Sequence, residues 1–244
     1  MSKVALITGA SRGIGKAIAI SLAKEGCDLV LNYNKSKREA EALSKFLNEE
    51  YKITSYPFCA DIGNIEDCEK LALFCFEKFK KVDILINNAG VCYDNELSER
   101  TVGQFVKTFN INVFGPFILT KIIGEQMVGN KYGKIVNISS NNSINQFFPT
   151  TIDYDASKSA LNSLTKNFAI EFSPYVNVNA VAPGWIKTDM NKDLTKEYME
   201  SEKEKILKKR IGKPEEVANL VSFLVSDKAD YINGEVIVID GGMF

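Results

Sequence analysis

Residues 3–19, KVALITGASRGIGKAIA, decide the fold of this chain. A short apolar run leads directly into Thr8 and three glycines, Gly9, Gly13 and Gly15, and a helix is predicted to follow. Glycine permits a tight turn and lets backbone N–H groups approach a pyrophosphate, while the helix N-terminus adds a favourable dipole. The spacing T-G-x-x-x-G-x-G differs from the commoner G-x-G-x-x-G. A tight strand-to-helix connection is the alternative, but the position directly after a first strand favours cofactor binding.

Apolar runs alternate with longer amphipathic stretches along the rest of the chain, which is typical of βαβ units and a parallel sheet. Strands are predicted at 3–8, 29–33, 54–59, 83–86, 134–139, 177–182 and 235–239. Several are apolar at consecutive positions, as expected when helices cover both faces of a sheet. We therefore predict an α/β fold, a doubly wound Rossmann-type three-layer sandwich with a mostly parallel seven-stranded sheet. No linker or repeat divides the chain, so a single domain over residues 1–244 is expected.

The composition narrows the classes of function. With 45% hydrophobic and 25% charged residues, the chain fits a soluble globular enzyme or binding protein. Its 30 basic and 31 acidic residues nearly balance, so nucleic acid is not an expected partner. The absence of histidine excludes Ser-His and Cys-His catalysis and argues against a catalytic zinc site, so no metal is predicted. Five cysteines without metal-ligand spacing, no secretory signal and no apolar run of about 20 residues predict a cytoplasmic protein with no membrane partner.

Residues 139–158, SSNNSINQFFPTTIDYDASK, carry the candidate chemistry. Ser140 follows the predicted end of a strand, and Tyr154 and Lys158 stand four positions apart at the start of a predicted helix, where they share a face. A phenol beside a fixed positive charge can act as a general acid or base. We expect Lys158, together with an oxidised nicotinamide, to lower the pKa of Tyr154. The alternative for such a pair is an ordinary helix surface.

The chain resembles the short-chain dehydrogenase/reductase family over essentially its whole length. The motifs that carry the resemblance are TGASRGIG at 8–15, NNAG at 87–90, Ser140 with Tyr154-x-x-x-Lys158, and PGWIKT at 183–188. The resemblance implies that Tyr154 protonates a carbonyl oxygen as hydride arrives, that Ser140 donates a hydrogen bond to that oxygen, and that Lys158 also holds the nicotinamide ribose. Asn112, aligned by the VFGPF that follows it, completes the implied catalytic set by holding a water in the proton path.

The cofactor implied by the resemblance is a nicotinamide dinucleotide. Asn34 follows the second strand where an NAD-selective site would have a carboxylate, and the cations Arg12 and Lys35 suit the charge of a 2'-phosphate, so NADP(H) is predicted. A solvated helix start is the alternative for Lys35, and a role in shaping a turn is the alternative for Asp61. The implied cofactor-binding positions are Gly9, Ser11, Arg12, Gly13, Ile14, Gly15, Asn34, Lys35, Ser36, Asp61, Ile62, Asn87, Ala89, Gly90, Tyr154, Lys158, Pro183, Gly184, Ile186 and Thr188.

Within the family, the chain is most similar to the 3-oxoacyl-acyl-carrier-protein reductases, through DNELS at 94–98, RIGKPEEVA at 210–218 and the GGMF ending. This similarity implies NADPH-dependent reduction of a 3-oxoacyl thioester in fatty-acid synthesis by a homotetramer, with acyl carrier protein as a candidate partner. Two features depart from the subfamily. Ser140 and Tyr154 are 14 residues apart, one more than its commonest spacing, and Phe147 and Phe148 make the intervening loop bulkier and more apolar. Of two basic docking positions, Lys131 matches one, but the other falls at Pro174 or Tyr175.

The sequence leaves alternatives open for the function. An enzyme of this family can act on another ketone, on a sugar or on a steroid. An alternative from a different class is a regulator that binds NADP without catalysis. The highly charged segment around residues 186–212 is predicted to be a lid over the substrate, with a solvated helix as the alternative.

Overall fold

Seven parallel strands form one sheet in the computed structural model, within residues 2–189 and 194–243, which the structure describes. They are β1 (Val4–Ile7), β2 (Asp28–Tyr33), β3 (Ser55–Cys59), β4 (Ile84–Asn87), β5 (Gly133–Ile138), β6 (Val176–Pro183) and β7 (Val236–Ile239). Their spatial order is β3-β2-β1-β4-β5-β6-β7, and every ladder is parallel. This confirms the predicted fold class, and each strand begins and ends within one residue of its predicted bounds.

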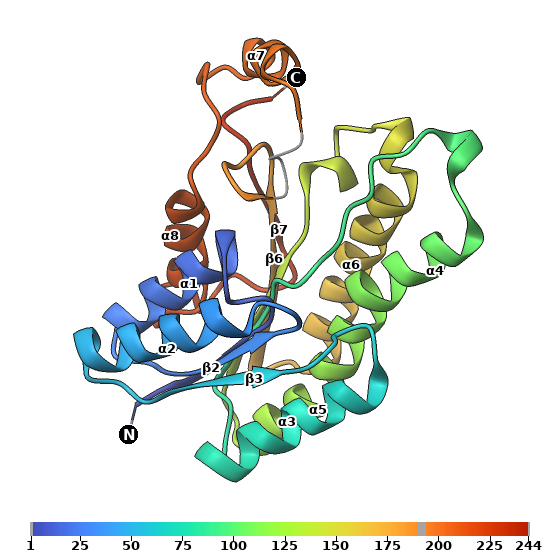
Figure 1. Cartoon of the computed structure of the whole chain (residues 1–244). Coiled ribbons are helices and arrows are strands. Elements are labelled where there is room, and N and C mark those ends of the chain that lie inside the picture. The colour runs from blue at the N-terminus through green and yellow to red at the C-terminus, as the bar shows by residue number, and fades with distance from the viewer. Residues whose placement is uncertain (1, 190–193, 244) are drawn as a thin grey trace.

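Helices cover both faces of the sheet, as the consecutive apolar positions of its strands require (Figure 1). The helices on one face are α1 (Gly13–Lys24), α2 (Lys37–Tyr51) and α8 (Pro214–Leu224), and those on the other are α3 (Ile65–Phe79), α5 (Gly115–Gly129) and α6 (Ile152–Glu171). Because side chains alternate along a strand, Ile7 of β1 is buried in one core and Leu6 in the other. Burying each such side chain contributes about 1.5–3 kcal/mol, so the two cores hold the three layers together.

Two further helices lie toward the carboxyl ends of the strands. Helix α4 (Val102–Phe109) continues into α5 through a π-helical turn at Asn110–Phe114, so one long helical stretch changes its hydrogen-bond pattern in the middle. Helix α7 (Lys196–Glu204) stands apart from the sheet at the top of Figure 1. It lies within the predicted lid at 186–212, of which residues 190–193 are outside the described part of the chain. The lid and the single domain remain predictions.

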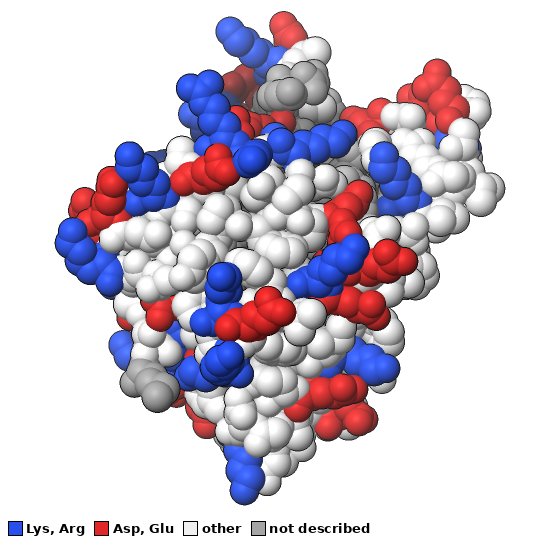
Figure 2. Space-filling view, turned by 60° about the horizontal axis from the view of Figure 1, so that its bottom comes forward, with Lys and Arg blue, Asp and Glu red and all other residues white. Residues whose placement is uncertain are grey.

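The near balance of charges in the sequence is also visible on the surface. On the face in Figure 2, lysine and arginine side chains are interspersed with aspartate and glutamate around a broad area without charged groups. None of the helices that the structure describes combines the length and the apolar character that a membrane span requires.

Candidate active site

The sheet brings the four sequence motifs to one edge. Thr8 and Gly9 follow β1, Asn88 follows β4, Ser140 follows β5 and Gly184 follows β6, so all of them lie at the carboxyl ends of parallel strands. The strand order reverses between β1 and β4, whose neighbouring ends are where open α/β sheets bind ligands. The predicted site residues therefore converge on the part of the fold that suits a cofactor.

The glycine loop after β1 is held in a shape that larger residues would disrupt. Gly9 has a φ of 62°, in the left-handed region, and a Cβ atom added to Gly15 would lie 2.4 Å from the Gly9 carbonyl oxygen. Asn88 fixes the loop, because its Nδ2 donates to the carbonyl oxygens of Thr8 at 2.8 Å and Gly9 at 3.2 Å. The side chain of Arg12, at the start of α1, makes no capping hydrogen bond. This compact turn before a helix N-terminus fits a pyrophosphate.

The residues predicted to bind the adenosine end lie after β2 and β3. Asn34 and Lys35 are exposed at the end of β2, and Arg12 is exposed at the end of the glycine loop. Asp61 accepts a hydrogen bond from the Gly63 amide at 2.9 Å, so its carboxylate shapes the turn before α3, as the alternative interpretation has it. The side chain of Ile62 is buried in the core. The predicted contacts of these two residues with the cofactor remain predictions.

The NNAG segment ties the neighbouring strands together. Asn87 Nδ2 donates to Asn137 Oδ1 on β5 at 2.8 Å and to Thr120 Oγ1 on α5 at 3.0 Å. The amide of Ala89 donates to Thr8 Oγ1 at 2.9 Å, which joins the ends of β1 and β4. These contacts fix the neighbouring ends of the two strands, where the resemblance implies that the cofactor lies.

Helix α6 presents Tyr154 and Lys158 on one face, as their spacing predicts. Lys158 is only 3% exposed, its Nζ donates to the Ile138 carbonyl oxygen at 2.7 Å, and it lies 5.5 Å from the centroid of the Tyr154 ring. A Cβ atom on Gly90 would lie 3.4 Å from the same Nζ, so only a small residue leaves this space open. Burial lowers the pKa of Lys158 to about 8.

The protein's own groups raise the pKa of Tyr154. It lies well above its ordinary value because the phenol loses hydration, while the neighbouring side chain of Ser140 lowers it. The predicted lowering by Lys158 together with an oxidised nicotinamide remains a prediction. The phenol is protonated at neutral pH, as a proton donor must be.

Asn112 lies in the π-helical turn and is fully buried. Its Nδ2 donates to the Val91 carbonyl oxygen at 2.9 Å and to Ser157 Oγ at 3.0 Å, and its Oδ1 accepts from the Val91 amide at 2.9 Å. These bonds satisfy the polar side chain inside an apolar helix. Asn112 thus connects the segment after β4 to α6, and its predicted role in holding a water remains a prediction.

An aromatic wall joins the loop before α6 to the α7 segment. The ring centroids of Phe148 and Trp185 are 6.4 Å apart, and those of Trp185 and Tyr198 are 6.1 Å apart, both edge to face. Trp185 Nε1 donates to the buried Glu202 at 3.1 Å, which fixes the indole ring. Of the two phenylalanines that were predicted to make the loop more apolar, Phe148 thus faces α7, whereas Phe147 is 69% exposed.

Two neighbours of Tyr154, Arg100 and Asp153, were not singled out from the sequence, and Cys92 is a third neighbour. Arg100 and Asp153 form a buried ion pair beside the tyrosine. The signal in the sequence was the aspartate directly before Tyr154. The folded chain buries this position completely.

Comparisons with known proteins agree with this geometry. Residues 9–244 match the profile of a family described as Enoyl-(Acyl carrier protein) reductase. The chain is 36% identical to a 3-oxoacyl-acyl-carrier-protein reductase of Aquifex aeolicus, with 99% of this chain and 97% of that protein covered. It is 37% identical to the corresponding reductase of a Synechocystis species, with 99% and 97% covered.

Solved structures show the same relationship. A short-chain dehydrogenase/reductase from Serratia marcescens is 32% identical, with a TM-score of 0.92 over 98% of this chain and 97% of that one. An acetoin dehydrogenase from Salmonella typhimurium is also 32% identical, with a TM-score of 0.90 over 100% and 96%. The fold and the site thus define an oxidoreductase that uses a nicotinamide cofactor. The chain belongs to the short-chain dehydrogenase/reductase family.

Proposed function

We propose that this protein uses NADPH to reduce the 3-oxo group of an acyl-carrier-protein thioester to a hydroxyl group in fatty-acid synthesis. The observation that carries the proposal is the position of the Ser140 hydroxyl, which is near enough to the Tyr154 side chain to lower its pKa, beside the buried Lys158, because two neighbouring hydroxyl groups can both reach one carbonyl oxygen. The 3-oxoacyl-acyl-carrier-protein reductases that resemble the chain along its whole length support the choice of substrate.

The residues of the site divide the work of the reduction. The reduced nicotinamide, when bound, supplies the hydride that the carbonyl carbon receives. Tyr154 gives its proton to the carbonyl oxygen, and its raised pKa keeps that proton available at neutral pH. Ser140 donates a hydrogen bond where negative charge develops on the oxygen. The Lys158 ammonium group then stabilises the phenolate that remains.

The pH dependence of the reduction follows from Lys158. We expect kcat for reduction to fall as the pH rises through about 8, because above this pKa the buried amine loses the positive charge that stabilises the phenolate. Below that pH the ammonium form predominates and kcat should be level on this account. A pH profile of kcat at saturating NADPH measures this decrease. A profile that stays level well above pH 8 would show that the charge of Lys158 does not support the reaction.

Preference for NADPH is proposed to come from Arg12 and Lys35. Removing either cation should raise KM for NADPH by about tenfold or more and leave KM for NADH nearly unchanged, since only NADPH carries the 2'-phosphate. Steady-state kinetics of Arg12→Ala and Lys35→Ala with both cofactors would measure this. Lys37→Ala is the matched control, because Lys37 is exposed and pairs with Glu41 on its own helix at 3.8 Å. Equal effects on both cofactors would refute the assignment.

Acyl carrier protein, a homotetramer and a cytoplasmic location are parts of the same proposal. Lys131 lies 6.0 Å from the ring centroid of Tyr175, so the two sequence positions considered for docking are neighbours in space. One basic and one aromatic side chain thus stand where the resemblance implies two basic ones. A weaker charge contact with an acidic carrier is the expected consequence.

A substrate panel tests the reaction itself. Purified protein would be assayed with NADPH and acetoacetyl-CoA, with acetoin as a small ketone, and with crotonyl-CoA as an enoyl thioester. Fastest turnover of acetoacetyl-CoA supports the proposal. Preference for acetoin would favour a small-ketone substrate, as in the acetoin dehydrogenase that shares the fold. Preference for crotonyl-CoA would overturn carbonyl reduction in favour of the reaction in the family description.

A further inference from the structure

A buried ion pair lies directly beside the catalytic tyrosine. Arg100 Nη1 and Asp153 Oδ1 are 2.7 Å apart, and their side chains are 4% and 0% exposed. Ion pairs at a protein surface are common and contribute little, but a pair removed from water loses its hydration and persists only where other groups satisfy both partners. The surroundings of this pair therefore indicate which parts of the fold it connects.

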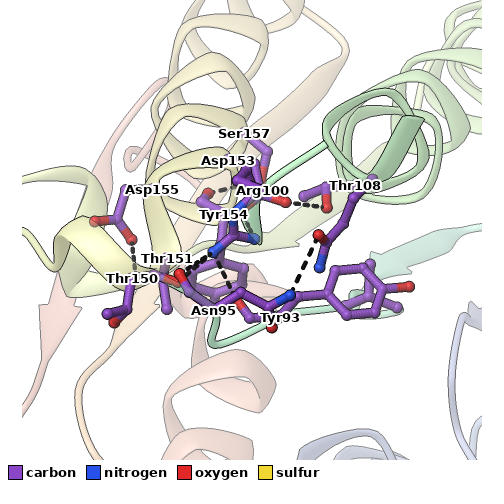
Figure 3. A network of polar contacts seen from close by, with 12 residues as sticks. Tyr93, Asn95, Arg100, Thr108, Thr150, Thr151, Asp153, Tyr154, Asp155 and Ser157 are labelled. Carbon is purple, nitrogen blue, oxygen red and sulfur yellow. Dashed lines mark hydrogen bonds and ion pairs between the residues drawn. The ribbon is translucent and has the colours of Figure 1, made fainter. Parts of the chain in front are cut away.

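Arg100 joins the segment after β4 to the start of α6 (Figure 3). Its Nη2 donates to the carbonyl oxygens of Tyr93 at 3.1 Å and Asn95 at 3.2 Å, within its own segment, and also to the carbonyl oxygen of Thr150, just before α6. A planar guanidinium group can hold several acceptors at once in a fixed geometry. Arg100 is thus a cross-link between residues 93–100 and the entry to α6.

Asp153 receives a second bond from a different helix. Thr108 Oγ1 on α4 donates to Asp153 Oδ2 at 2.5 Å, while Oδ1 accepts from Arg100. Both carboxylate oxygens are therefore held by groups from outside α6. Asp153 also lies in the first turn of α6, where the helix dipole favours a negative charge.

Tyr154 is enclosed between two anchored acids. Asp153 precedes it, and Asp155 follows it with hydrogen bonds from Asn142 Nδ2 at 2.9 Å, the Phe148 amide at 3.0 Å and Thr151 Oγ1 at 3.0 Å. Asp153 thus ties the first turn of α6 to the β4 side of the site, and Asp155 ties the same turn to the loop between β5 and α6. The backbone of Tyr154 is fixed from both sides.

We propose that Arg100 and Asp153 are positioning residues of the reaction, which hold the first turn of α6 so that the Tyr154 hydroxyl lies near Ser140, and which neutralise each other so that no unpaired buried charge lies one residue from Tyr154. This rests on the proposed function, in which Tyr154 transfers the proton. The pair acts through Tyr154 and does not itself take part in the proton or hydride transfer.

The electrostatic part gives the pair a signature that a merely structural ion pair lacks. The titratable groups around Tyr154 are Cys92 from the segment after β4, and Asp155 and Lys158 from α6, while Asp153 acts on the neighbouring Cys92. Without Arg100, the buried carboxylate of Asp153 would lose its cation one residue before a phenol that must become a phenolate. A like charge nearby disfavours the phenolate and so raises the pKa of Tyr154. In alcohol oxidation Tyr154 acts as the base, so activity rises with pH as the phenol loses its proton. This rising limb of the pH profile should move to higher pH.

The experiment compares Arg100→Met, Asp153→Asn and the double variant with the wild-type protein. For Arg100→Met we expect kcat to fall by about tenfold or more with KM for NADPH little changed, and the limb of the oxidation profile to move up by about one pH unit. The double variant, which has neither charge, should return the limb to its wild-type position. Hydrogen exchange of the peptide that spans residues 145–158 should be faster in Arg100→Met, whether or not the enzyme turns over the substrate chosen.

Lys134→Met is the matched control. Lys134 is 2% exposed and pairs with Asp230 at 2.7 Å, the same separation, but it lies toward the opposite end of β5 from Ser140. This variant should lose thermal stability while its kcat, oxidation limb and exchange at residues 145–158 stay as in the wild type. If Arg100→Met behaves in the same way, the proposal is wrong.

Thr108→Val covers the case in which Arg100→Met does not fold, because it removes the bond at Asp153 Oδ2 and leaves both charges in place. It should speed exchange at residues 145–158 and lower kcat without moving the limb, and unchanged exchange would overturn the positioning role. A wild-type protein that reduces no carbonyl compound would contradict the proposed function, while the exchange comparison still decides whether the pair positions α6.

Discussion

Tyr154→Phe will lower kcat for ketone reduction by about 10²- to 10⁴-fold, because phenylalanine keeps the ring and loses the proton that the carbonyl oxygen must receive. The structure makes this proton hard to replace. Loss of hydration raises the pKa of Tyr154, and Ser140 is the hydroxyl group that lies near it. Steady-state rates of NADPH oxidation, measured by the change in NADPH absorbance, would report the loss.

The same variant should still bind NADPH with a dissociation constant within a few-fold of the wild-type value, as measured by cofactor fluorescence. Tyr132→Phe is the matched control, since Tyr132 precedes β5 at the opposite end from Ser140 and should leave the rate unchanged. If Tyr154→Phe retained most of the activity, the proton would have to come from another group and the proposed mechanism would be wrong.

Lys158→Met will abolish most of the activity and at the same time raise the free energy of unfolding at pH 7. Activity should fall by about 10²-fold or more, because the phenolate loses its cation. For stability, burial lowers the pKa of Lys158 from 10.5 to about 8, which corresponds to a cost on the order of 3 kcal/mol. The variant removes this cost but leaves the Ile138 carbonyl oxygen without its donor, which costs about 1–3 kcal/mol. A net gain of about 1 kcal/mol is expected in chemical denaturation.

The gain should depend on pH in a defined direction. Below pH 8 both the folded and the unfolded chain carry the charged lysine, so the full cost of burying the charge is present. Between pH 8 and 10.5 only the unfolded chain carries the charge, and this cost disappears as the pH rises. The difference between variant and wild type should therefore shrink over this window. Lys134→Met makes the same change at another buried lysine, one that has a carboxylate partner, and should destabilise the protein instead. Equal loss of stability in both variants would contradict the conclusion that the buried charge of Lys158 lowers the free energy of unfolding.

The elements of the fold could be predicted closely because their signals are local. An apolar β-rich run that ends in glycine or asparagine marks a strand such as β1 or β4 wherever it occurs, and Pro214 marks the start of α8. The proposed catalytic pair was equally accessible, since Tyr154 and Lys158 lie four residues apart on one helix. Once the strands are parallel, their carboxyl ends must share an edge, and the motifs meet there.

The features that escaped prediction depend on contacts between distant segments. Arg100 and Asp153 are separated by 53 positions, and nothing near Arg100 in the sequence shows that it points at the aspartate beside the tyrosine. The burial of Tyr154 escaped prediction for a related reason. Its helical neighbour Lys158 could be seen in the sequence, but the loss of hydration that raises the pKa of Tyr154 comes from the folded surroundings. The π-helical turn at Asn110–Phe114 has no signal in the amino-acid types.

That π-helical turn makes the number of residues between α4 and α5 as important as their identity. Thr108 and Asn112 both reach α6, through Asp153 and Ser157, while Gly115 must face Ile62, whose carbonyl oxygen would lie 2.3 Å from any Cβ placed there. Adding or removing a single residue would rotate one half of the stretch by about 100° relative to the other, so that either the bonds to α6 or the packing on Ile62 would be lost. Exposed positions such as Phe114 can be exchanged, but the length of this stretch is fixed.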